Sequence, residues 1–454
     1  MHISILNQRH TSSHHPDDRG MTRFPLLSML RLFSEPGHKG ALLNRFSSVL
    51  LGVSLLLLQA CASSPPLEAR HQVSGLNSHF NGEPLAFADY VASSRAVIAK
   101  THAGLKPAEA GVVVDGNAPF ELKPAASCAA GHSKPYRRGV LLTHGLTDSP
   151  YFMRNLAIFF QENCFRVMAI LLPGHGTQPG DLLDVTWEDW AKAEAYGTEK
   201  LAAEADEIYL AGFSTGGALS VYQSLRDKRV RGLFLFSPAF KVSSKAALAN
   251  LHKLYSWLMP SAKWVDIMPD QDIYKYESFT KNAAAQIYAL TKEVGSQLGE
   301  QEVNIPVFAA ASQDDTSVDA PATLEFMAHA RNPSSRMVLY TTDAKKFPVG
   351  IPAEKLELVN SVLPEQKILG SAHTAILLPQ GDTHYGSAGD YSNCIHYYPD
   401  SMEKYNFCNK NPKKDLQGEL TEENLKRGVI RRLMYNPNYA VLKVSMKRFV
   451  DNLP

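Results

Sequence analysis

The sequence predicts an α/β fold in which a mostly parallel sheet is flanked by helices. Between residues 139 and 236, short apolar runs alternate with segments of helical spacing, which is the pattern of parallel strands joined by helical crossovers. His144, His175 and Ser214 each come just after one of the apolar runs. Because sites in such folds form at the carboxyl ends of the strands, this clustering predicts a functional site at one edge of the sheet.

The alternating segments can be assigned in chain order. The run at 139–143 ends in His144-Gly145 and has the length and apolar composition of a buried strand. Further strands are predicted at 165–172, 207–212, 230–236 and 305–310. Helices are predicted between them, at 150–163, 187–205 and 216–226.

The interval 239–304 interrupts the alternation and is helical in character. We interpret it as an insertion that either caps the ligand edge of the sheet or supplies ordinary core-facing helices. The pattern leaves both readings open. Its large apolar residues are Leu251, Leu254, Tyr255, Trp257, Leu258, Met259, Trp264, Ile267 and Met268.

The last strands are harder to order. The run at 335–340 is strand-like but lies far from His373 along the chain, and 367–369 could be a further strand. Two helices are predicted beyond residue 378, at 421–434 and 438–453. The second is expected to pack on the sheet through Leu442, Val444 and Phe449.

The N-terminal region has the pattern of an export signal. Arg45 precedes a short apolar run, small residues and then Cys61, and the run is too short for a comfortable membrane span. Leu58-Gln-Ala-Cys61 resembles the bacterial lipobox, which implies a lipid on Cys61 and, with no Asp following, a lipoprotein of the outer membrane. We therefore expect a signal peptide at 1–60, a tether and extension at 61–126, and the main domain at 127–454. A plain signal peptide or an uncleaved anchor is the alternative.

Composition narrows the possible partners and the redox compartment. The 454 residues carry a formal net charge of +1 and are 44% hydrophobic, so nothing favours a nucleic-acid partner. Without Cys61 the chain keeps four cysteines, an even number that suits an oxidising compartment. Sequence proximity favours the pairs Cys128–Cys164 and Cys394–Cys408, with four unpaired thiols as the alternative.

Gly212-Phe-Ser214-Thr-Gly216 fits the pattern G-x-S-x-G between a predicted strand and a predicted helix. The glycines allow a tight strand-to-helix turn that exposes the serine hydroxyl. The helix N-terminus behind it favours developing negative charge. This context predicts that Ser214 is a nucleophile rather than a polar turn residue.

A nucleophilic serine needs a base, and the base needs an orienting acid. Asp315 follows a predicted strand, and His373 follows a later strand-like run, in the chain order serine, acid, histidine. The rivals for these roles are Asp314, Asp319 and His384. No Cys-x-x-Cys and no His/Asp/Glu cluster has metal-ligand spacing, so neither a metal nor another cofactor is expected.

From about 139 to 373 the chain resembles the α/β-hydrolases of the bacterial carboxylesterase and monoacylglycerol-lipase group. The resemblance rests on the serine motif and on His144-Gly-Leu-Thr-Asp-Ser-Pro150, Leu171-Leu-Pro-Gly-His-Gly176 and Val185-Thr-Trp-Glu-Asp-Trp190. It implies an α/β-hydrolase fold with a helical cap, Ser214 as nucleophile, Asp315 as acid and His373 as base. It also implies an oxyanion hole built from the main-chain N–H groups of Leu146 and Thr215.

These roles predict an exported serine esterase that acts on short- to medium-chain acyl esters or monoacylglycerol-like lipids. A thioesterase or amidase using the same three side chains is the nearest alternative. A non-catalytic envelope lipoprotein that reuses the fold is the alternative from another class.

Overall fold

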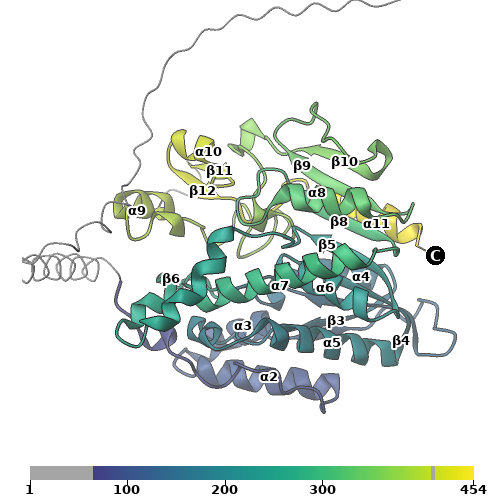
Figure 1. Ribbon diagram of the computed structural model, residues 1–454, viewed down its shortest axis with the longest axis horizontal. Helices are drawn as coiled ribbons and strands as arrows, with labels where there is room; N and C mark the ends of the chain where they lie inside the picture. Colours follow the sequence, from purple (N-terminus) through teal and green to yellow (C-terminus); the bar gives the residue numbers. More distant parts are fainter. Residues whose placement is uncertain (1–64, 411–414, 454) are drawn as a thin grey trace, which may run out of the picture. The chain divides into compact units, whose positions relative to one another are not determined.

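The computed structural model describes residues 65–410 and 415–453 (Figure 1), so the predicted signal peptide and Cys61 lie outside the described residues. Its main feature is an eight-stranded sheet in the order β1-β3-β2-β4-β5-β8-β9-β10. The first strand, β1, runs antiparallel to β3, and every other neighbouring pair is parallel. The strands are β1 (Phe120–Leu122), β2 (Tyr136–Thr143), β3 (Phe165–Ile170), β4 (Ala205–Phe213), β5 (Val230–Phe236), β8 (Val307–Ser312), β9 (Arg336–Thr341) and β10 (Leu356–Asn360).

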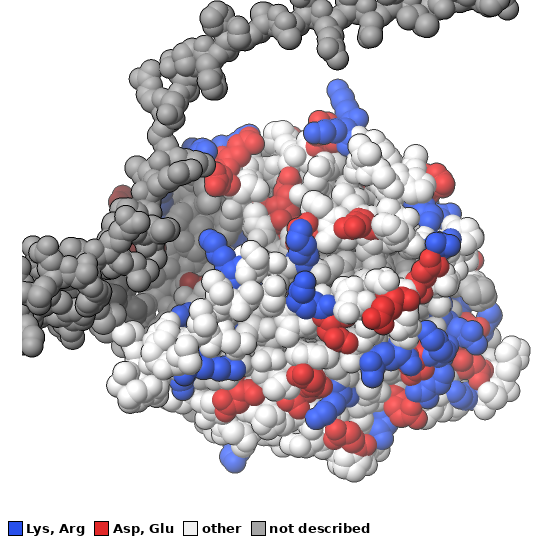
Figure 2. Space-filling view, viewed as in Figure 1, with Lys and Arg blue, Asp and Glu red and all other residues white. Residues whose placement is uncertain are grey.

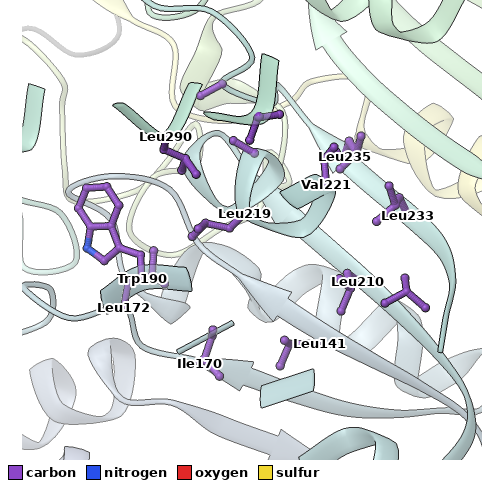
Figure 3. Close-up of a cluster of buried hydrophobic side chains, with 14 of the residues drawn as sticks. Leu141, Ile170, Leu172, Trp190, Leu210, Leu219, Val221, Leu233, Leu235 and Leu290 are labelled. Carbon is purple, nitrogen blue, oxygen red and sulfur yellow. The ribbon is translucent and has the colours of Figure 1, made fainter. Parts of the chain in front are cut away.

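Helices cover both faces of this sheet, and the strand sequences explain why. Because side chains alternate across a strand, Leu141 of β2 joins one apolar cluster while its neighbours Val140 and Leu142 join the other. Figure 3 shows the first cluster, in which Leu210 of β4 and Leu219 lie among its members. This face carries α5 (Trp187–Glu204), α6 (Thr215–Arg226), α7 (Lys281–Glu300) and α8 (Ala320–His329), and the opposite face carries α4 (Arg154–Glu162) and α11 (Tyr439–Asp451).

The predicted strands and helices up to residue 236 are confirmed, with boundary shifts of a few residues. The sheet also begins earlier than the predicted domain boundary at 127, because β1 pairs with β3. Between residue 65 and β1 the chain forms the 3₁₀ helix η1 (Ala69–His71) and the α-helices α2 (Phe87–Thr101) and α3 (Pro107–Asn117).

The interval 239–304 divides into two parts. Its second half is α7, which buries Ile287, Leu290 and Val294 in the core. Its first half contains the 3₁₀ helices η4 (Ser244–Leu254) and η5 (Pro260–Lys263) and a small ribbon of β6 (Trp264–Asp266) and β7 (Phe279–Thr280). Five of the nine apolar residues singled out above are exposed: Leu251, Leu254, Tyr255, Trp257 and Leu258. With Leu248 they form the apolar surface 248–258.

The C-terminal region differs from the prediction in two places. The predicted helix at 421–434 is a short helix, α10 (Glu422–Lys426), followed by β12 (Ile430–Arg432). Gly428, with φ 136°, lies between them in a conformation that a continuing helix does not allow. The run 367–369 is not a strand of the main sheet; Ile368 forms isolated bridges to Leu363 and Gln417 instead.

The last helix behaves nearly as predicted. In α11, Leu442 and Phe449 are buried against the sheet, whereas Val444 is half exposed because it lies on the outer side. The additional strand β10 was not predicted, and it extends the sheet beyond β9.

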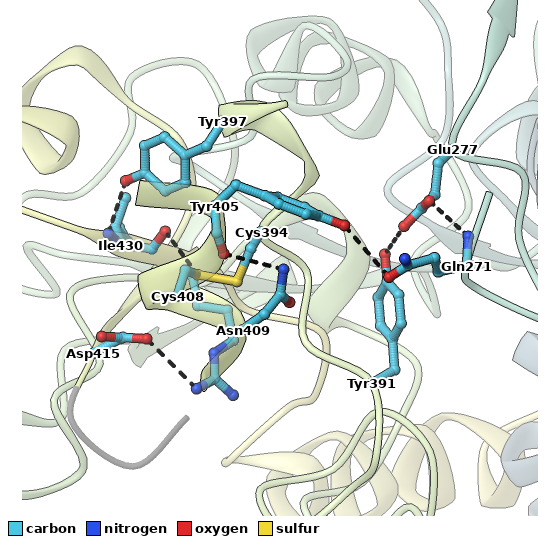
Figure 4. Close-up of a disulfide and its surroundings, with 11 residues drawn as sticks. Gln271, Glu277, Tyr391, Cys394, Tyr397, Tyr405, Cys408, Asn409, Asp415 and Ile430 are labelled. Atoms are coloured by element: carbon cyan, nitrogen blue, oxygen red, sulfur yellow. Dashed lines mark hydrogen bonds and ion pairs between the residues drawn. A yellow bond between two sulfur atoms is a disulfide. The ribbon is translucent and has the colours of Figure 1, made fainter. Parts of the chain in front are cut away.

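Both predicted disulfides are present. Cys128–Cys164 closes a sequence separation of 36 residues, and Cys394–Cys408 closes one of 14. The second ties the segment before α9 (Met402–Lys410) to that helix, as Figure 4 shows.

The surface carries no large field of one sign on the face drawn in Figure 2, where acidic and basic side chains are interspersed. Among residues 65–410 and 415–453, no helix combines the length and the apolar character needed to cross a bilayer.

Candidate active site

Ser214 lies at the sharp turn between β4 and α6. Its backbone has φ 53° and ψ −113°, a conformation that costs a non-glycine residue about 1–3 kcal/mol. The turn is held from both sides, since Ser214 N–H donates to Phe236 at 2.9 Å and the Ser214 carbonyl accepts from Ala239 at 2.9 Å. This strain, held by neighbouring main chain, is what a nucleophile elbow requires.

The flanking glycines are required by close contacts between main-chain segments. A Cβ on Gly212 would lie 2.2 Å from the Gly216 carbonyl carbon, and one on Gly216 would lie 2.1 Å from the Thr143 carbonyl oxygen. Real Cβ atoms do not approach backbone this closely, so no other residue fits without moving β2 or α6. The spacing of the sequence motif therefore follows from packing.

Asp315 and His373 are brought together from distant parts of the chain. Asp315 Oδ2 lies 2.6 Å from His373 Nδ1, and the Asp315 side chain is 1% exposed. The other carboxylate oxygen accepts the N–H groups of Ser317 at 2.8 Å and Val318 at 3.0 Å, which fixes its orientation. The His373 ring also packs against the Phe213 ring, with centroids 5.0 Å apart, and Phe213 directly precedes Ser214.

The rival carboxylates make other contacts. Asp314 has a buried Oδ2 without a hydrogen-bond partner among the described residues, and burial, reinforced by the charge of Glu419, raises its pKa to about 6. Asp319 caps α8 through the N–H of Ala322 and pairs with Lys241 at 2.7 Å. Of the three candidate acids, Asp315 is the one in contact with His373.

The rival histidine is also engaged elsewhere. His384 Nδ1 lies 2.5 Å from Asp390 and its Nε2 lies 3.2 Å from Asp272. Burial opposes its charged form, but the two carboxylates outweigh burial and raise the pKa of His384. This imidazole joins the segment at 272 to the segment at 384–390.

The loop 144–148 begins beside the serine turn, where a Cβ on Gly216 would lie 2.7 Å from the His144 carbonyl oxygen. Thr147 has φ 65°, and its N–H donates to His175 Nε2 at 3.0 Å while its carbonyl accepts from Tyr276 at 2.8 Å. No hydrogen bond within the described ranges uses the main-chain N–H of Leu146 or of Thr215. Both groups therefore remain available to a ligand, as an oxyanion hole requires.

His144 and His175 organise this loop as neutral imidazoles. His144 Nε2 accepts from Leu172 N–H at 3.1 Å, and His175 Nδ1 donates to the Pro173 carbonyl at 2.9 Å. Burial lowers the pKa of both rings, that of His175 to about 4. Each ring offers one donor and one acceptor, and the hydrogen bonds use both.

Lys275 is a residue that sequence reasoning missed. It comes from the interval 239–304, and its Nζ donates to Thr147 Oγ1 at 2.8 Å and to the carboxylate of Asp148. Asp148 is 2% exposed, and burial raises its pKa although the Lys275 charge opposes the rise. A lysine in an apparent insertion gives no local signal that it reaches a loop so distant along the chain.

Glu419 and Arg432 were missed for the same reason. Glu419 accepts the main-chain N–H of His373 at 2.9 Å, and Arg432 pairs with Glu419 at 2.9 Å.

Within the described parts of the chain, no group of three His, Cys, Asp or Glu side chains is placed to hold a metal ion.

A family model described as "Serine aminopeptidase, S33" matches residues 134–342, which include β2, the Ser214 elbow and Asp315. The fold is that of the α/β-hydrolases. The matched residues end before β10, His373 and the C-terminal region.

Sequence relatives match shorter stretches of the chain. The thermostable monoacylglycerol lipase of Bacillus sp. (strain H-257) is 32% identical over 109 residues, which are 24% of this chain and 44% of that protein. The carboxylesterase of Bacillus subtilis (strain 168) is 35% identical over 85 residues, 18% of this chain and 35% of that protein. The chain thus spans less than half the length of these two curated relatives.

Solved structures overlap a larger share of the chain at low identity. The monoacylglycerol lipase of Paleococcus ferrophilus has 17% identity and a TM-score of 0.36, and the match covers 47% of this chain and 91% of that one. A metagenome-derived lipolytic enzyme has 22% identity and a TM-score of 0.41, with 49% and 87% covered.

Proposed function

We propose that this protein is a serine hydrolase that cleaves carboxylic esters, with Ser214 as nucleophile, His373 as base and Asp315 as acid. The observation that carries the proposal is the buried contact of 2.6 Å between Asp315 Oδ2 and His373 Nδ1. The same imidazole packs against Phe213, the residue directly before the strained Ser214 turn. A serine at an elbow, a histidine and an orienting carboxylate are the three groups that acyl transfer through serine needs.

The chemistry follows from these contacts. His373 Nδ1–H donates to Asp315, which leaves Nε2 as the basic nitrogen that takes the Ser214 proton. Ser214 Oγ bonds to the ester carbonyl carbon, and the carbonyl electron pair moves to oxygen. Collapse of this tetrahedral intermediate breaks the ester C–O bond, and the imidazolium gives its proton to the leaving alcohol. Water, deprotonated by His373, then releases the acid and restores Ser214.

The unengaged N–H groups of Leu146 and Thr215 support an oxyanion hole for the intermediate. Thr215 also stands at the N-terminus of α6, where the helix dipole favours negative charge. Loss of one such donor typically costs about 2.7–4 kcal/mol of transition-state stabilisation.

The proposed substrates are short- to medium-chain acyl esters or monoacylglycerol-like lipids. The names of the two Bacillus relatives, a monoacylglycerol lipase and a carboxylesterase, support this class. The apolar surface 248–258 supports it as well, because an enzyme of lipid esters gains from apolar groups that contact lipid; Leu254 and Trp257 there are 77% and 75% exposed.

The proposed location is the bacterial cell envelope, with a lipid on Cys61 and the outer membrane as its site. The basic–apolar–small–cysteine order of residues 45–61 and the two disulfides of the exported part support this proposal. Mass spectrometry of the N-terminal peptide of the purified cellular protein tests it. A diacylglyceryl modification on Cys61 is expected, and an unmodified N-terminus elsewhere would contradict it.

The same three side chains would also serve a thioesterase or an amidase, and the aminopeptidase in the family description favours the amidase. A panel of matched p-nitrophenyl esters, thioesters and aminoacyl anilides separates these activities. A non-catalytic envelope role predicts that the folded protein hydrolyses none of them.

Ser214→Ala tests the proposal, with the exposed helical Ser296→Ala of α7 as its matched control. We expect the first variant to lose hydrolysis of p-nitrophenyl acyl esters while its circular dichroism and melting temperature stay close to those of the wild type. We expect the control to keep the wild-type rate. Undiminished hydrolysis by folded Ser214→Ala would overturn the assignment.

A further inference from the structure

Glu419 reaches both of the loops that carry the proposed acid and base. Its Oε2 accepts the main-chain N–H of His373 at 2.9 Å and that of Thr316 at 3.5 Å, and Thr316 directly follows Asp315. The Glu419 side chain is 0% exposed. One fully buried carboxylate therefore contacts the main chain on both sides of the Asp315–His373 hydrogen bond.

Arg432 completes this arrangement. Its Nε and Nη2 donate to the two Glu419 oxygens at 2.9 and 3.0 Å, and Nη2 also donates to Ser317 Oγ at 2.7 Å. Burial alone would raise the pKa of Glu419, but the Arg432 charge and the N–H donors outweigh it and lower that pKa to about 2. Both groups are therefore ionised throughout the neutral range. The planar guanidinium of Arg432 makes two hydrogen bonds to the Glu419 carboxylate, which fixes the geometry of the pair.

The surrounding chain holds this pair in place. Glu419 follows β11 (Leu416–Gly418), which pairs in parallel with β12, so that Gly418 lies opposite Arg432. Arg432 N–H donates to the Asn393 carbonyl at 3.0 Å, next to the Cys394–Cys408 disulfide. Figure 4 shows that disulfide beside Ile430 of β12, whose N–H donates to Tyr397 Oη at 3.0 Å.

The loop that bears His373 depends on the same region. The N–H of Leu369 donates to the Gln417 carbonyl at 2.8 Å, and Thr374 Oγ1 donates to the Leu433 carbonyl at 2.9 Å. All of these partners lie beyond residue 342, where the family match ends. The C-terminal region thus supplies the main-chain supports of His373.

We propose that Glu419 and Arg432 are positioning residues that fix the main chain of His373 and of the Asp315 loop in the geometry that proton transfer from Ser214 needs. The inference rests on the proposed function of Ser214, Asp315 and His373. A misplacement of about 1 Å in such a constellation can lower the rate about 100-fold, so a clamp on both loops acts mainly on kcat.

The decisive variant is the double substitution Glu419→Leu/Arg432→Met. Replacing both members of a buried ion pair with apolar groups of similar volume is often neutral for stability, whereas removing one member is strongly destabilising. We expect the double variant to fold, to lose about 100-fold in kcat, and to change KM by less than about three-fold. Arg432→Lys, which keeps the charge and loses the fork, should retain an intermediate kcat.

A matched control is the exposed pair of Glu423 on α10 and Arg427, the residue that follows this helix; their charged atoms lie 2.6 Å apart. Glu423→Gln/Arg427→Met removes the same charges from the same region without touching either loop. We expect it to keep the wild-type kcat. Wild-type kcat in the folded Glu419→Leu/Arg432→Met variant would overturn the proposal.

A pH profile separates positioning from a purely structural role. Glu419→Gln leaves the Arg432 charge uncompensated near the imidazole, which disfavours the imidazolium formed when Ser214 loses its proton. The acid limb of kcat/KM against pH is then expected to move to lower pH. If a folded Glu419→Gln protein keeps the acid limb of its kcat/KM profile at the wild-type pH, the Arg432 charge does not act on the imidazolium. Among the described residues, the charged or titratable groups that face this region are Asp148, Lys275, Asp314, Asp315, His396, Glu419, Glu423 and Arg432.

The rate of labelling by a fluorophosphonate distinguishes failure of this inference from failure of the proposed function. If the wild type is not labelled, the proposed function fails. If the wild type is labelled and the folded double variant is labelled at the same rate, only the positioning role fails. We expect the double variant to be labelled about 100-fold more slowly than the wild type.

Discussion

Lys275→Met removes the only ion pair that the structure gives to Asp148 within the described residues. The lysine is 20% exposed and the aspartate 2% exposed, so the substitution leaves a nearly buried carboxylate without its counter-charge. Breaking a buried pair in this way costs about 3–5 kcal/mol of unfolding free energy. The same substitution removes the hydrogen bond to Thr147, and therefore one support of the loop that contains Leu146.

The loss of unfolding free energy in Lys275→Met should be smaller at low pH than at high pH. Burial already raises the folded-state pKa of Asp148, and loss of Lys275 raises it further. A raised folded-state pKa contributes stability below the unfolded-state value, and this contribution is lost as the pH rises through the folded-state value. The variant should therefore be closer to wild-type stability at pH 5 than at pH 8.

Urea unfolding at pH 5 and pH 8, followed by circular dichroism, measures this difference. Asp148→Asn/Lys275→Met serves as the partner variant, since it removes both charges, and it should recover most of the stability lost at pH 8. An equal loss at both pH values, or no recovery in the double variant, would refute the buried-pair reasoning.

Three further predictions concern the site and the core. Asp315→Asn should lower kcat about 10⁴-fold with little change in fold, because the amide favours the wrong tautomer of His373; a decrease below about ten-fold, measured with p-nitrophenyl esters, would contradict the acid role. Gly216→Ala should abolish soluble expression or activity because its Cβ would lie 2.1 Å from the Thr143 carbonyl oxygen, and a folded, active variant would show that the elbow can shift. Burial raises the pKa of Glu194 to about 7, so the free energy of unfolding falls as the pH rises towards 7. In urea unfolding at pH 8, Glu194→Gln should therefore be more stable than the wild type by up to about 3 kcal/mol. Equal stability of the two proteins at pH 8 would contradict the burial effect.

The sheet and the serine turn could be predicted because both leave local signals. Strands such as β2 and β4 are short apolar runs that end at a glycine-containing turn, and the elbow needs glycines at fixed positions around Ser214. Chain order and local geometry were sufficient in these places.

The missed features depend on contacts between distant segments. Lys275 meets Asp148 across 127 residues, and Glu419 meets His373 across 46, so neither spacing forms a pattern in the sequence. The predicted helix at 421–434 was wrong because helical spacing continued through Gly428, whose φ of 136° ends the helix. The exposed leucines of the apolar surface 248–258 have helical spacing, and periodicity alone does not separate an exposed apolar face from a buried one.

The proposed function requires that Ser214 is a nucleophile activated by His373. Intact-protein and peptide mass spectrometry after treatment with a fluorophosphonate tests it most directly, with wild type, Ser214→Ala and His373→Ala compared under identical conditions. We expect a single phosphonyl adduct on the peptide that contains Ser214, absent from Ser214→Ala and formed far more slowly in His373→Ala. Labelling of folded Ser214→Ala at the wild-type rate, or no adduct on the wild type, would contradict it.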